Sequence, residues 1–132
     1  MKKSAMTALF TVAAGYDGVL GVLFLILPWR LYEAFGVTPP NHWAYVQFPA
    51  CLLLVFALMF LAVARDPEAN RALIPYGILL KVAYSGTVFS YWMLQSIPPM
   101  WKPFALADLL FILLFAWAYL TLGARDGRQA AR

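Results

Sequence analysis

Long apolar runs separated by short polar segments dominate this sequence. Four such runs cover residues 5–27, 43–64, 72–95 and 104–123. A helix needs ~20 mostly apolar residues to cross a bilayer, because the hydrocarbon core is ~30 Å thick and each residue rises ~1.5 Å. Backbone polar groups in lipid must be paired within their own segment, so these runs should be helical. The pattern therefore predicts an all-α polytopic membrane protein, a single bundle of four transmembrane helices spanning residues 1–132.

The composition supports lipid as the solvent. Hydrophobic residues make up 64% of the chain and charged residues 12%. A soluble domain has ~45–50% apolar and ~25% charged residues. This chain has too little polar surface to cover itself in water.

Residue types that carry common chemistry are scarce. Cys51 is the single cysteine, which excludes a disulfide within the chain, and His42 is the single histidine. The sequence contains no Gly-rich phosphate loop and no Cys-x-x-Cys or His-Glu-x-x-His motif. We therefore expect no metal, no cofactor and no catalytic residue of a standard type. The net charge of +4 comes from basic residues at the ends of the apolar runs, so we expect no nucleic-acid partner either.

Local signals predict how the runs begin and end. Asp66 and Pro67 are suited to the N-cap and first position of the third helix, which would place Pro75 inside that helix as a kink. Residues 30–35, followed by Gly36, are typical of a short interfacial helix, although an ordered loop is an equal alternative.

The lysines and arginines outside the runs are distributed unequally. The side of the two termini carries Lys2, Lys3, Arg65, Arg71, Arg125, Arg128 and Arg132, and the other side carries Arg30 and Lys102. Cytoplasmic loops carry the excess of basic residues, so both termini are expected in the cytoplasm of a bacterial inner membrane. The same bias argues against an antiparallel dimer of the kind that small multidrug exporters form.

Three charged residues interrupt the apolar runs, namely Asp17, Lys81 and Asp108. A charge at mid-bilayer costs about 2.5–3.5 kcal/mol on insertion scales, so such residues normally face the bundle interior and find partners. We expect an inward-facing polar cluster in the outer half of the bundle. Its members are Asp17, Lys81 and Asp108, with Gln47, Tyr84 and Ser85 as hydrogen-bonding neighbours. The cluster is either a structural ion pair or a proton, ion or ligand site that opens outward.

Three segments carry a resemblance to a known family. They are Tyr16-Asp17-Gly18-Val19-Leu20-Gly21, Leu27-Pro28 and Ala107-Asp108-Leu109-Leu110. With the overall layout, they resemble the small four-helix bacterial membrane proteins grouped as DoxX-like, over most of the chain. The resemblance implies a four-helix bundle, and some members of that group are linked to membrane redox or thiol-stress systems. No functional residue carries over, because no diagnostic motif is matched.

Three functions agree with these patterns. The favoured interpretation is an accessory or structural membrane subunit, because polar groups are few and the cytoplasmic loops are short. The alternatives are an oligomeric proton- or ion-coupled small transporter and a membrane enzyme acting on a lipid-soluble substrate. The expected partners are membrane lipid and either another membrane protein or a second copy of the chain.

Overall fold

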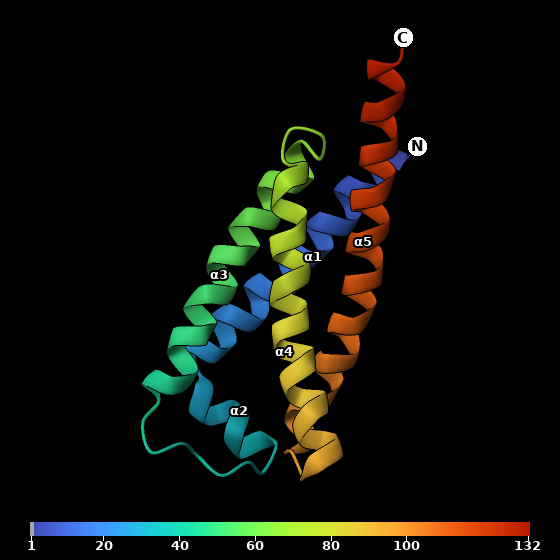
Figure 1. Ribbon diagram of the computed structural model, residues 1–132. Helices are drawn as coiled ribbons and strands as arrows, with labels where there is room; N and C mark the ends of the chain where they lie inside the picture. Colours follow the sequence, from blue (N-terminus) through green and yellow to red (C-terminus); the bar gives the residue numbers. More distant parts are fainter. Residues whose placement is uncertain (1) are drawn as a thin grey trace.

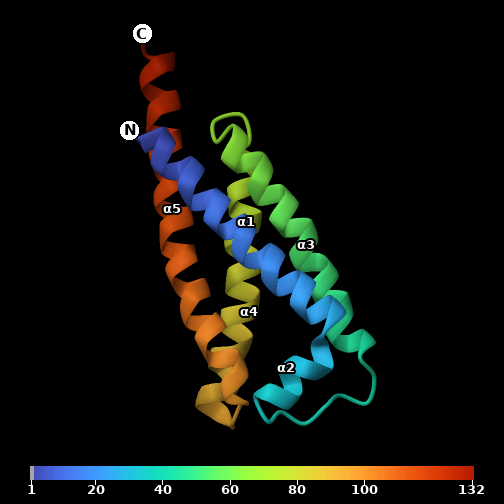
Figure 2. The ribbon, with the colours of Figure 1, turned by 180° about the vertical axis from the view of Figure 1, so that it is seen from behind.

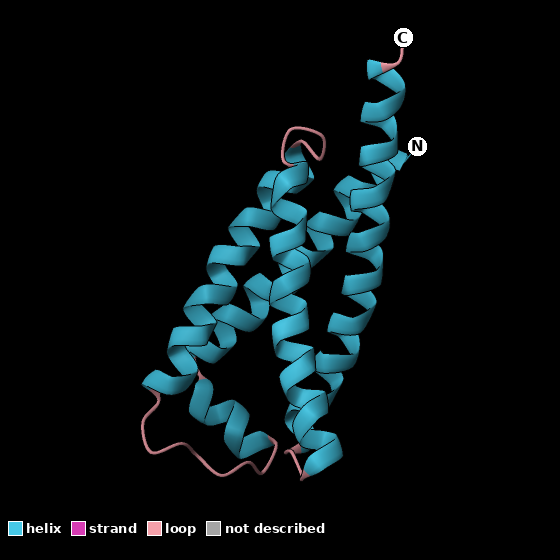
Figure 3. Cartoon of the chain, in the orientation of Figure 1, coloured by secondary structure: helices cyan, strands magenta, loops and turns pink. Residues whose placement is uncertain are grey.

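Helices are the only regular secondary structure in the part of the chain that the computed structural model describes, residues 2–132 (Figure 3). Met1 lies outside the described residues. The long helices are α1 (Lys2–Ile26), α3 (Ala44–Arg65), α4 (Ile74–Leu94) and α5 (Lys102–Ala130). All four, with α4 and α5 each taken together with the 3₁₀ turn before it, are long and apolar enough to cross a membrane, which confirms the predicted fold class.

The bundle consists of two helical hairpins. Helix α1 packs mainly against α3, and α4 packs mainly against α5. Both termini lie at the same end as the α3–α4 loop, and α2 (Pro28–Ala34) lies at the opposite end beside the α4–α5 connection (Figure 1). We call these the terminal end and the α2 end. Seen from behind, α1 crosses diagonally in front of α4, from α5 to α3 (Figure 2).

Helix α2 decides between the two alternatives for residues 30–35, because the chain there is helical as far as Ala34. Pro28 stands at its start, where a missing N–H is tolerated because the first amides of a helix have no partner within it. Gly36 follows its end with φ +64°, a conformation that glycine adopts without steric cost. The helix buries Tyr32 against the α2 end of the bundle.

Two predictions about helix boundaries are wrong. Asp66 does not begin a helix, because it ends α3 and accepts a hydrogen bond from the backbone of Ala69 at 3.1 Å within a turn. Helix α4 begins only at Ile74, after the 3₁₀ turn Arg71–Leu73, so Pro75 lies in the first turn of α4, where it causes no kink. Helix α5 also continues beyond residue 123, the end of the apolar run, because the polar segment that follows is helical as far as Ala130.

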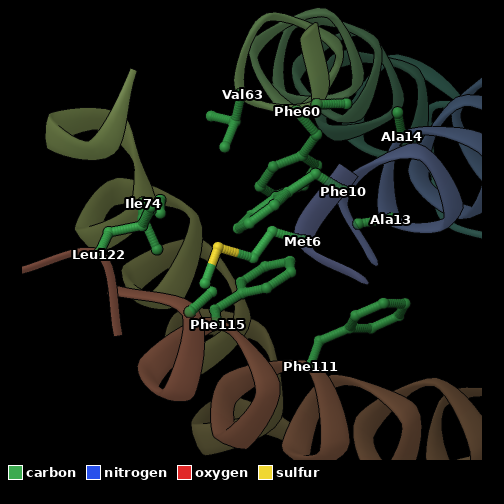
Figure 4. Close-up of a cluster of buried hydrophobic side chains, with 12 residues drawn as sticks. Met6, Phe10, Ala13, Ala14, Phe60, Val63, Ile74, Phe111, Phe115 and Leu122 are labelled. Carbon is green, nitrogen blue, oxygen red and sulfur yellow. The ribbon is translucent and has the colours of Figure 1, made fainter. Parts of the chain in front are cut away.

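The terminal half of the bundle is filled with side chains (Figure 4). The rings of Phe10 and Phe115 stack with their centroids 4.8 Å apart, and Phe60 lies 5.2 Å from Phe115. These three phenylalanines, from α1, α3 and α5, are fully buried, and Ile74 of α4 joins them. This packing forms a solid aromatic base on the terminal side of the polar residues at the middle of the bundle.

Candidate functional site

The structure brings the three charged residues of the apolar runs together next to the aromatic base, on the side that faces the α2 end. Lys81 of α4 donates a hydrogen bond from Nζ to Oδ1 of Asp17 on α1 at 2.6 Å. The same Nζ lies 3.0 Å from Oδ1 of Asp108 on α5. The exposed fractions of the side chains are 2% for Lys81, 1% for Asp17 and 7% for Asp108. We call these residues the charge triad.

The other three residues expected in the cluster have different roles. Ser85 donates a hydrogen bond to the carbonyl of Lys81, one turn earlier on α4, at 2.6 Å. Tyr84 donates to the carbonyl of Trp101 at 2.9 Å and so joins α4 to the start of α5. Gln47 donates to the carbonyl of Leu25 at 3.1 Å, near the end of α1, and not to the charge triad.

The position of Gln47 has a local cause. The last four carbonyls of a helix have no partner within it, and Pro28 removes one donor that could have reached back. The Gln47 amide supplies a partner to one of these carbonyls from the neighbouring helix. Sequence reasoning placed Gln47 at the right end of the bundle and assigned it the wrong partner.

Aromatic rings surround the ammonium group of Lys81. Its Nζ lies 5.2 Å from the ring centre of Tyr16 and 5.1 Å from that of Phe111. Cations within about 6 Å of a ring centre are attracted by the electrons of the ring face. The Oη of Tyr16 and the Oδ2 of Asp17 are buried and have no hydrogen-bond partner among the described residues.

A pocket of about 580 Å³ extends from the charge triad toward the α2 end. Binding sites for small molecules typically have volumes of about 300–1,000 Å³ and mostly apolar walls with a few polar groups. This pocket has that character. It is lined by Tyr16, Asp17, Leu20, Phe24, Tyr32, Tyr45, Val46, Pro49, Ala50, Leu52, Leu53, Leu80, Lys81, Tyr84, Thr87, Val88, Tyr91, Ile97, Trp101, Phe104 and Asp108.

Helices α3 and α4 diverge toward the α2 end (Figure 1), and the exposed lining residues place the mouth of the pocket between them. Its exposed lining residues stand on these two helices, with Tyr45 69% exposed on α3 and Tyr91 51% exposed on α4. At the α2 end, the ring of Tyr32 packs edge-on against Trp43 and Trp101, at centroid distances of 5.2 and 6.0 Å. The sequence left a structural ion pair and an outward-opening site as alternatives, whereas the exposed lining residues of this pocket stand on the sides of α3 and α4.

Burial of the Tyr32 phenol, on α2 between two of the long helices, raises its pKa. The Tyr32 side chain therefore stays neutral at physiological pH and adds no charge to the closed end of the pocket.

Sequence reasoning missed Pro49 and Tyr16 as pocket residues. Pro49 lies inside α3 and has no N–H to donate to the carbonyl of Tyr45, one turn earlier, so the wall contains a carbonyl that lacks its usual helix partner. A proline within an apolar run and a tyrosine next to a buried aspartate were the available signals. The apolar wall residues gave no signal, because lipid-facing positions use the same residue types.

No family model, curated protein or solved structure matches this chain. Among residues 2–132, the structure contains no group of three His, Cys, Asp or Glu side chains that could hold a metal ion.

Proposed function

We propose that this protein binds a lipid-soluble molecule that enters from the bilayer between α3 and α4. The observation that carries the proposal is an apolar pocket of about 580 Å³ that ends at three buried charged groups. The apolar part of the ligand would contact the pocket walls near Leu52 and Val88, and its polar end would contact the charge triad. A mouth that faces hydrocarbon suits a ligand that is already dissolved in lipid.

The charge triad also supports a structural role. Asp17 belongs to one hairpin, and Lys81 and Asp108 belong to the other. The ion pair therefore joins the two hairpins, which supports the structural interpretation. Both roles are compatible, because a binding group is more effective when its neighbours hold it rigidly.

Binding is better supported than transport through one subunit. The packed aromatic base formed by Phe10, Phe60 and Phe115 lies on the far side of the charge triad from the pocket. A path across the membrane would require this base to open or a second copy to supply the route. A role as an accessory subunit that holds a ligand for a partner protein stays a prediction, as does membership of the DoxX-like group.

We place the chain in a bacterial inner membrane with both termini in the cytoplasm. The support is the excess of lysine and arginine at the terminal end, seven residues against Arg30 and Lys102 at the other end. A fluorescent-protein fusion after Arg132 should fluoresce, and alkaline phosphatase inserted within residues 37–41 should be active. The opposite pair of results would reverse the orientation.

Occupancy of the pocket can be tested at its mouth. Thr87 lines the mouth, whereas Ser90 lies one turn further along α4 and does not line the pocket. Each hydroxyl donates a hydrogen bond to the carbonyl four residues earlier at 2.7 Å, so replacing either residue removes the same kind of local hydrogen bond. Thr87→Trp should block entry with its large side chain, and Ser90→Trp is the matched control.

The measurement is native mass spectrometry of protein released from mild detergent, with identification of the retained molecule. We expect the wild type and Ser90→Trp to retain a lipophilic molecule and Thr87→Trp to lose about 90% or more of it, which at ligand concentrations well below the Kd corresponds to about a tenfold loss of affinity. Equal retention by Thr87→Trp, or no retained molecule in the wild type, would contradict the proposal.

A further inference from the structure

The charges of the site do not balance. Asp17 and Asp108 carry two negative charges when ionised, and Lys81 carries one positive charge. Among residues 2–132, no other Asp, Glu, Lys or Arg lines the pocket. An uncompensated charge in a medium of low dielectric constant is costly, so the triad needs one further positive charge, either a bound proton or a cation.

The geometry presents an acceptor to the pocket. The ammonium of Lys81 is occupied, because its Nζ lies 2.6 Å from Asp17 and 3.0 Å from Asp108. Asp108 keeps the largest exposed fraction of the three side chains, and Oδ2 of Asp17 has no hydrogen-bond partner in the part of the chain that the structure describes. An anion entering the pocket would meet a carboxylate and find no free cation, whereas a positive group would find a carboxylate.

The walls favour the same class of ligand. Eight of the lining residues are aromatic, namely Tyr16, Phe24, Tyr32, Tyr45, Tyr84, Tyr91, Trp101 and Phe104. Aromatic faces attract cations, and most strongly where water is excluded. The ammonium of Lys81 already uses the ring of Tyr16 in this way, at 5.2 Å from the ring centre.

We infer that the ligand is a lipophilic cation, an amine or quaternary ammonium or phosphonium group carried on an apolar body. This inference rests on the proposed function, because it names the class of molecule that the pocket holds. The cation takes the place of the proton, which leaves the carboxyl for the solvent, and no covalent bond forms. The other ionisable groups that face the pocket are tyrosines, Tyr16 from α1, Tyr32 from α2, Tyr45 from α3, and Tyr84 and Tyr91 from α4.

Aryl probes of similar shape that carry a positive, a negative or no charge give a direct test. Tetraphenylphosphonium, tetraphenylborate and neutral triphenylphosphine oxide can be titrated calorimetrically into the full chain in a zwitterionic detergent, with micelle blanks. We expect tetraphenylphosphonium to bind the wild type about tenfold or more tightly than either other probe. Titration in two buffers of different ionisation enthalpy should show about one proton released per cation.

Asp108→Asn removes the excess negative charge and keeps the shape of the side chain. This variant should lose the preference for the cation and the proton release. Asp126→Asn is the matched control, because Asp126 stands on the exposed end of α5 outside the pocket. It should behave like the wild type.

The outcomes separate the two proposals. If the neutral probe binds as well as tetraphenylphosphonium and Thr87→Trp blocks both, the pocket binds lipophilic molecules and the inference about charge is wrong. If no probe binds the wild type, the proposed function fails as well. If Asp108→Asn does not fold, the probe series and the proton count on the wild type still decide, and absent proton release would overturn the inference.

Discussion

Lys81 and Asp17 are joined by a hydrogen bond of 2.6 Å between side chains that are almost completely buried. The two residues come from α4 and α1, in different hairpins, so their pairing sets how the hairpins meet. A buried pair is stabilising only while both partners are present, because the loss of one leaves the other charged and without water. The triad therefore makes the fold sensitive to single substitutions.

We expect Lys81→Met to be the most destabilising change in the triad. It leaves two buried carboxylates without a cation, and breaking such a pair costs about 3–5 kcal/mol. Asp108→Asn should cost less, because the pair between Lys81 and Asp17 stays matched. Unfolding in mild detergent, monitored by circular dichroism, would rank the two variants by their unfolding free energies.

Acid should relieve part of the Lys81→Met loss, because protonation removes the charge from the two carboxylates. The difference in unfolding free energy between the wild type and this variant should therefore become smaller as the pH falls. Asp126→Asn should change stability by less than about 0.5 kcal/mol, as is usual for surface positions. A Lys81→Met protein as stable as the wild type at neutral pH would refute this account of the triad.

Close packing of α1 on α3 makes Gly21 intolerant of a larger residue. A Cβ there would lie 3.0 Å from the backbone oxygen of Ala50 and 2.9 Å from Cδ2 of Leu54, and the backbone cannot move aside cheaply. Gly21→Ala should therefore cost about 1–3 kcal/mol, the usual range for overpacking. Gly15→Ala, on the same helix with nothing within 4 Å of its added Cβ, should be neutral or stabilising by up to about 1 kcal/mol. Equal melting temperatures for the two variants would argue against this close approach.

The aromatic base should depend on Phe115. This side chain is fully buried against Phe10 and Phe60, so Phe115→Ala should cost about 3–5 kcal/mol through lost contacts and a cavity. Leu113→Ala on the same helix removes a side chain that is 68% exposed and should cost far less. A comparison of their unfolding free energies checks the position of the base, and a costlier Leu113→Ala would mean that α5 is rotated.

The end of α1 should depend on Gln47. Gln47→Leu removes the donor to the Leu25 carbonyl and leaves a partly buried acceptor unpaired, at a cost of about 1–3 kcal/mol. Gln95→Leu is the control, since Gln95 is exposed after the end of α4. Hydrogen exchange of the amides around residue 27 should become faster in Gln47→Leu only. Unchanged exchange would show that the Gln47 side chain does not hold this helix end.

Much of the architecture could be predicted from particular residues. Each apolar run is long enough to cross a bilayer by itself, so the four spanning helices follow from local chemistry and do not depend on their neighbours. Asp17, Lys81 and Asp108 had to face inward for a similar reason, because the cost of a charge in lipid belongs to each residue alone. For residues 30–35, by contrast, the sequence left a short helix and an ordered loop as equal alternatives, because a glycine such as Gly36 suits the end of either.

The sequence by itself therefore determined the number of spans and the residues that avoid lipid. Only the tertiary structure decided the pocket, its sideways mouth and the partner of Gln47. The physical reason is that lipid and the interior of the helix bundle are equally apolar. Leu52 in the pocket wall and Leu58 on the outer surface therefore look alike in the sequence. Which of them lines a cavity depends on the rotation and spread of α3 against α4, and packing with the other helices sets both.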